Sequence, residues 1–173
     1  NPPLFNLQGK GEAVAVSRNM PSPPESRLSL SLALQLDRLN CDAAKKVKPT
    51  VVAIVARKAR KDNEETSTRS EKSLQQDFGS GFLIDANGFI LTNHHVVEGA
   101  LALDVSLADG RSVPGRLVRS DPSSDIALVK IESGSLPVAR LGDSNGLEAG
   151  QRILAIGHPF GLLQTVSSGI IGA

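Results

Sequence analysis

The pattern of hydrophobic and polar positions changes its period near residue 49. Before this point, from Leu28 to about Val47, leucine and alanine recur at helical spacing, which predicts one amphipathic helix over residues 28–47. Pro49 ends the pattern because proline cannot continue a helix, and the β-branched run that follows predicts a buried strand over residues 50–56. Five of the ten prolines fall within residues 1–27 without sustained periodicity, so a disordered or processed segment is expected there.

Short apolar runs bounded by turn residues fill the second half of the chain. The tripeptides Ala86-Asn87-Gly88 and Ala108-Asp109-Gly110 have the composition of hairpin turns. Short strands at this spacing favour a sandwich or barrel over alternating strands and helices, so the predicted fold class is all-β. The predicted strands cover residues 81–85, 89–92, 103–107, 112–118, 126–131, 152–157 and 165–171.

Two segments without strand character divide this region. In residues 57–77 charges of both signs crowd together, which predicts an exposed, mobile loop rather than a binding patch. The stretch GDSNGLEAG, residues 142–150, predicts a connection between one closed β unit, residues 48–141, and the start of a second, residues 142–173. The second unit would hold two strands, too few to bury a face alone.

Composition excludes several classes of function. Nineteen basic and 18 acidic side chains leave a net charge of +1, and Trp and Tyr are absent, so we expect no nucleic-acid partner. The single cysteine, Cys41, cannot form an intrachain disulfide. The apolar run 51–56 is far shorter than the roughly 18 residues of a membrane helix, so no membrane span is expected.

Residues 28–36, LSLSLALQL, admit a second interpretation as the apolar part of a secretion signal, with Met20 as the start. Asp37 and Arg38 stand where small residues should mark a cleavage site, so we favour the helix.

Two adjacent histidines, His94 and His95, follow the predicted strand 89–92 in a short helical turn with Asn93 as its cap and Gly99 at its end. Neighbouring side chains on a helix point in different directions, so the pair is badly placed to share a metal ion. Zinc would need a third ligand, and no Cys or His spacing supplies it, so we expect no metal site. A general base needs only one imidazole and a carboxylate that orients it.

Asp125 is a candidate for that carboxylate because it opens the apolar strand IALVKI after a turn. It could equally be a capping residue of the turn, a role that Asp121, which precedes a proline, fills more obviously. The residues alone leave these two interpretations even.

Four motifs occur in a fixed order. They are GSGFLIDANGFILTNHHVV (79–97), SSDIALVKI (123–131), LGDSNGLEAG (141–150) and AIGHPFGLLQTVSSGII (155–171). In this order and at this spacing they closely resemble the trypsin-like HtrA/Deg serine endopeptidases, and the resemblance covers about residues 45–173. It implies a trypsin-like double β-barrel, with the first barrel complete and the second truncated, preceded by one N-terminal helix.

The resemblance also implies roles for individual residues. The family pattern T-N-x-H-V-V places the general base at His95 and leaves His94 at a variable position, where it is a partly exposed neighbour. The segment S-D-I-A-L-V-K places the orienting acid at Asp125. No cofactor is implied. The expected partners are polypeptide substrates, and members of the family commonly form homotrimers and carry PDZ domains in the bacterial periplasm or cell envelope.

The family's nucleophile lies in a G-N-S-G-G segment, and nothing of that form occurs before Ala173. Ser144, in Gly142-Asp143-Ser144-Asn145-Gly146, imitates a protease signature, but it precedes both strands of the second unit, so we interpret it as part of a plain turn. Ser80 is not a candidate nucleophile either. His158, before Pro159, is expected to shape a tight turn.

The resemblance implies a serine-type endopeptidase that acts on unfolded or damaged proteins, with the nucleophile beyond the chain end, and we expect this fragment to be inactive. The alternative is a non-catalytic β-barrel module that binds peptides or partners, with His95 and Asp125 as relics. A metal-dependent hydrolase is a third interpretation. The substrate-binding residues are unknown.

Overall fold

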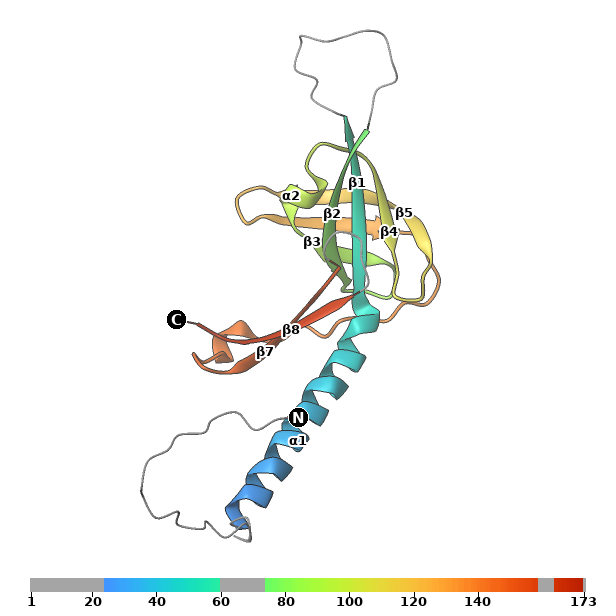
Figure 1. Cartoon of the computed structure of the whole chain (residues 1–173). Helices are drawn as coiled ribbons and strands as arrows, with labels where there is room; N and C mark the ends of the chain where they lie inside the picture. The colour runs from blue at the N-terminus through green and yellow to red at the C-terminus, as the bar shows by residue number, and fades with distance from the viewer. Residues whose placement is uncertain (1–23, 60–73, 159–163, 173) are drawn as a thin grey trace, which may run out of the picture. The chain divides into compact units, whose positions relative to one another are not determined.

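The computed structural model describes residues 24–59, 74–158 and 164–172 (Figure 1). The chain divides into two units, residues 1–37 and 38–173, and the helix α1 (Pro24–Val47) runs from the first into the second. It begins at Pro24 rather than at the predicted Leu28, because proline is well accommodated in the first turn of a helix. Its described leucines are exposed, among them Leu39 at 65%.

Six strands form a closed barrel in the order β1-β2-β3-β6-β5-β4, with every neighbouring pair antiparallel. The pairing of β1 with β4 closes the barrel and leaves no edge strand in it. A 3₁₀ turn, η1 (Lys48–Thr50), joins α1 to the barrel. The strands are β1 (Val51–Ala59), β2 (Leu74–Leu83), β3 (Phe89–Thr92), β4 (Ala100–Ser106), β5 (Ser112–Asp121) and β6 (Ile126–Ile131).

The hydrophobic core fills the barrel. Alternate residues of β6 point inward, so Ala127, Val129 and Ile131 are buried while their neighbours are partly or fully exposed. Ile54 of β1 and Ile90 of β3 are fully buried in the same cluster. Burying each such aliphatic side chain stabilises the fold by roughly 1.5–3 kcal/mol. The predicted all-β barrel is confirmed.

The hairpin turns also follow the prediction. Gly88 and Gly110 end the predicted turns with φ of 96° and 88°, a backbone conformation that glycine adopts without strain. Asp85 accepts hydrogen bonds from the backbone and the side chain of Asn87, which holds the first turn.

The prediction of a loop over residues 57–77 is wrong at both ends of this range. Strand β1 continues to Ala59 and β2 already begins at Leu74, while residues 60–73 lie outside the described part. Lys58 of β1 and Asp77 of β2 form an ion pair with 2.7 Å between Nζ and Oδ2. Opposite charges paired across strands are compatible with a sheet, which a count of charges along the sequence does not reveal.

The last described elements form a separate two-stranded sheet of β7 (Arg152–Gly157) and β8 (Thr165–Ile170), preceded by the 3₁₀ turn η2 (Ser144–Gly146). The side chains of β8 are exposed, as expected for two strands that cannot bury a face by themselves. The described architecture is therefore one complete barrel followed by a two-stranded sheet. Among the described residues, no helix has the length and apolar character needed to cross a membrane.

Candidate catalytic pair

A short helix at one end of the barrel carries both adjacent histidines. This helix, α2 (His94–Val97), follows β3 directly, and its second half is buried, with Val96 5% and Val97 1% exposed. The two valines pack into the barrel core and so leave the histidines at the rim. Gly99, with φ of 66°, follows the helix as predicted.

Asp125 lies next to α2 because β6 pairs with β3. Its φ of 53° is the one positive value among the described residues other than glycine, in a region where aspartate is more tolerated than most residues. In this conformation the carbonyl oxygen of Asp125 accepts the backbone N–H of His94 at 3.1 Å. The main chain thus joins the start of β6 to the start of α2.

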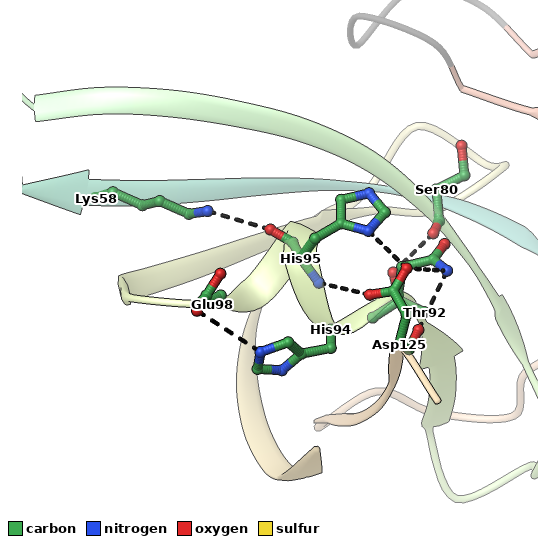
Figure 2. A network of polar contacts seen from close by, with 8 residues as sticks. Lys58, Ser80, Thr92, His94, His95, Glu98 and Asp125 are labelled. Carbon is green, nitrogen blue, oxygen red and sulfur yellow. Dashed lines mark hydrogen bonds and ion pairs between the residues drawn. The ribbon is translucent and has the colours of Figure 1, made fainter. Parts of the chain in front are cut away.

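The side chain of Asp125 makes two hydrogen bonds to His95 (Figure 2). Oδ1 accepts the backbone N–H of His95 at 2.9 Å, and Oδ2 lies 2.8 Å from the ring nitrogen Nδ1. An ionised carboxylate only accepts hydrogen bonds, so Nδ1 carries a proton, and in the neutral ring Nε2 keeps its lone pair. Nε2 is on the side of the ring away from Asp125, where it can take a proton from a reacting hydroxyl.

The surroundings of Asp125 favour its ionised form. The backbone N–H of His95 lowers the pKa of this carboxyl group most, and the side chain of His95 and the amide of Asn93 lower it further. The His95 side chain is 67% exposed and that of Asp125 is 44% exposed. Both groups are therefore accessible to solvent and to a second reactant.

His94 points away from this pair (Figure 2). Its Nε2 lies 3.8 Å from Oε1 of Glu98, and its side chain is 17% exposed, in keeping with the partly exposed neighbour expected at this position. The two histidines do not converge on one point. In residues 24–59, 74–158 and 164–172, no three His, Cys, Asp or Glu side chains gather to hold a metal ion.

Asp121 caps the turn before β6, the role that its place before a proline indicated. Its Oδ1 accepts the backbone N–H of Ser123 at 3.0 Å and the Ser123 hydroxyl at 2.7 Å, and its Oδ2 accepts the Ser124 hydroxyl at 2.7 Å. These bonds lower the pKa of Asp121 to about 2. The structure brings Asp125, and not Asp121, into contact with His95.

The two serines considered as nucleophiles are in structural positions. Ser144 opens η2, where Asp143 accepts the backbone N–H of Asn145 at 2.9 Å, so the predicted turn is confirmed. The Ser80 hydroxyl accepts the backbone N–H of His158 at 2.7 Å. Pro159, with which His158 is predicted to shape a turn, lies outside the described residues.

Sequence reasoning missed two residues of this site. Asn93 stands at the N-cap position as predicted, but its side chain makes no capping hydrogen bond and contacts Asp125 instead. Lys58 donates to the carbonyl oxygen of His95 at 3.3 Å. A polar residue before a helix normally caps it, so the sequence suggested a different role for Asn93. Lys58 is distant from His95 in the sequence, so no local pattern indicated their contact.

The family model of the trypsin-like peptidase domain matches residues 79–173. A Marinomonas protein named "Probable periplasmic serine endoprotease DegP-like" is 46% identical over 103 residues, 60% of this chain and 22% of its own length. A Halomonas elongata protein of the same name is 50% identical over 99 residues, 57% of this chain and 21% of its own length. The chain thus spans about a fifth of these relatives.

Solved structures of HtrA-type proteases are similar to this chain as well. The HtrA-type protease AlgW with a tripeptide superposes with a TM-score of 0.67 at 38% identity, over 77% of this chain and 39% of AlgW. AlgW with a decapeptide gives a TM-score of 0.65 at 34% identity, over 77% of this chain and 45% of that one. The fold and the imidazole–carboxylate pair define a trypsin-like architecture. The chain belongs to the trypsin-like peptidase domain family.

Proposed function

We propose that this chain supplies the general base, His95, and the orienting acid, Asp125, of a serine endopeptidase that cleaves unfolded or damaged polypeptides. The observation that carries the proposal is the 2.8 Å contact between His95 Nδ1 and Asp125 Oδ2. That contact leaves Nε2 available to accept the proton of a serine hydroxyl and to return it to the leaving amine. Asp125 stabilises the imidazolium that forms between these steps.

The remaining machinery belongs, in this proposal, to the second barrel. Acyl transfer needs a serine nucleophile and amide donors that stabilise the tetrahedral oxyanion. Residues 142–173 contribute β7 and β8, and the only serine in a protease-like motif there, Ser144, lies in η2. The 173-residue chain alone is therefore expected not to turn over peptide bonds. The names of the DegP-like relatives support location in the bacterial periplasm.

A chimera tests the proposal. Residues 1–173 are joined to the part of the Marinomonas relative that follows the region aligned with this chain, and cleavage of unfolded casein is measured. We expect casein cleavage by the chimera and none by residues 1–173. Asp125→Asn should lower kcat by roughly 10⁴-fold and His95→Ala by at least as much.

His94→Ala and Ser144→Ala are the matched controls, since one lies beside the proposed base and the other is the decoy serine. Both should retain the activity of the parent chimera. Full activity of the His95→Ala chimera would overturn the proposal, as would turnover by residues 1–173 that Ser144→Ala abolishes. A folded chimera without activity would instead support the non-catalytic binding module.

A further inference from the structure

The side chain of Asn93 makes two contacts with Asp125. Its Nδ2 lies 3.2 Å from the carboxylate oxygen Oδ2 and 3.2 Å from the carbonyl oxygen of the same residue. Both oxygens can only accept hydrogen bonds when the carboxylate is ionised, so the amide must present its NH₂ group to them. Asn93 therefore donates to the side chain and to the main chain of Asp125 at once.

This arrangement differs from what an asparagine at a helix start normally does. At the N-cap position its side-chain oxygen would accept the N–H of the second or third helical residue, here His95 or Val96. In this site Asp125 Oδ1 accepts the N–H of His95, so a carboxylate from the turn before β6 caps α2. The side chain of Asn93 therefore does not cap α2 and donates to Asp125 instead.

The contact with Asn93 matters because it restrains both the side-chain rotamer and the backbone conformation of Asp125. Its side chain is 44% exposed, so packing alone does not select its rotamer. Its backbone has φ of 53°, a conformation that costs free energy for a residue with a side chain and persists only where neighbours hold it. Hydrogen bonds to its carbonyl from His94 N–H and from the Asn93 amide supply that restraint.

We propose that Asn93 is a positioning residue that holds Asp125 so that Oδ2 faces Nδ1 of His95. The inference rests on the proposed function, because it concerns the same imidazole and carboxylate. Asn93 touches no reacting atom in this role. It acts through Asp125, by limiting the carboxylate to the orientation that keeps the proton of His95 on Nδ1.

The test locates that proton directly in residues 1–173 and does not require catalytic activity. Nitrogen-15 NMR of the neutral ring distinguishes His95 protonated on Nδ1 from His95 protonated on Nε2, the form that an unrestrained imidazole prefers. The parent chain should show mostly the Nδ1–H form. Asp125→Asn is the reference that removes the carboxylate, and Asn93→Ala should raise the Nε2–H fraction several-fold.

Two further variants keep the test interpretable. Asn93→Asp preserves the size of the side chain while removing its NH₂ donor, so it should shift the tautomer even where alanine perturbs the fold. Asn87→Ala is the matched control, because Asn87 also donates through Nδ2 to an aspartate, Asp85, at 3.0 Å, but in the turn before β3. It should leave the His95 tautomer unchanged.

The outcomes separate the two proposals. If Asp125→Asn shifts the tautomer while Asn93→Ala and Asn93→Asp both leave it at the parent value, the positioning role is wrong and the His95–Asp125 pair stands. If Asp125→Asn itself has no effect, the pair fails and the positioning role fails with it. In the casein-cleaving chimera, Asn93→Ala should lower kcat roughly tenfold and change KM little, since a hydrogen bond to a charged group is lost away from the substrate.

Discussion

Val96 of α2 packs directly over Gly79 of β2, so that a β-carbon built on Gly79 would lie 2.5 Å from each γ-carbon of Val96. Val96 is 5% exposed within the barrel core and has little room to move. The absence of a side chain at residue 79 thus lets α2, which carries His95, lie against the barrel.

Gly79→Ala should therefore displace α2 and lower the free energy of unfolding by about 1–3 kcal/mol, the range typical of overpacking a core. Urea denaturation measures the stability, and amide shifts of the helix report its displacement. Gly146→Ala is the control, because a β-carbon there meets nothing within 4 Å, and it should change stability by less than about 0.5 kcal/mol. Equal effects of the two substitutions would contradict the packing argument.

Lys58 links the first barrel hairpin to the proposed base. Its Nζ lies 2.7 Å from Asp77 Oδ2 and 3.3 Å from the carbonyl oxygen of His95, and its side chain is 18% exposed. Lys58→Met should lower the free energy of unfolding by about 0.5–1 kcal/mol, the upper range for an ion pair that solvent still reaches. Urea denaturation at neutral pH measures it.

The same substitution should raise the pKa of Asp77, because the hydrogen bond from Lys58 is the main cause that holds it below its ordinary value. Lys45→Met provides the comparison, since Lys45 and Asp42 are 3.7 Å apart with both side chains largely exposed. It should leave stability unchanged. Unchanged titration of Asp77 in Lys58→Met would refute the assignment.

Asp121 makes the stability of the folded chain depend on pH in the acid range. Its pKa in the folded chain is about 2, held down first by the hydroxyls of Ser123 and Ser124, while an aspartate in an unfolded chain titrates near roughly 4. The folded pKa is the lower one, so the stabilisation is complete above about pH 4 and is lost as pH falls toward 2. Carbon-13 NMR of the Asp121 carboxyl should show a midpoint near 2.

Ser123→Ala and Ser124→Ala should each raise that midpoint, because each removes a hydroxyl donor to the carboxylate. Ser135→Ala, an exposed serine outside the turn, should leave it where it is. A midpoint near 4 in the parent chain would show that the hydroxyls do not hold the carboxylate as described.

Much of the barrel was predictable because its cues are local. The strands Phe89–Thr92, Ile126–Ile131 and Arg152–Gly157 have the predicted bounds, since alternation and turn residues lie within a few positions of one another. The full length of β1 and β2 was not predicted, because Lys58 and Asp77 lie in a charged stretch that is typical of a loop. Only their ion pair across the two strands shows that they belong to the sheet. Local patterns do not contain contacts between distant residues.

The sequence by itself determined the all-β fold, the family resemblance and the two histidines as candidate bases. The residues alone left both histidines, and a turn-capping role for Asp125, open, and the family resemblance then chose His95 as the base and Asp125 as the acid. Only the tertiary structure decided that Asp125 contacts His95 while Asp121 caps its own turn. It alone turned Asn93 from a helix cap into a donor to Asp125. The physical reason is that a hydrogen bond depends on distance and direction between groups about 30 residues apart, and the pairing of β3 with β6 sets both.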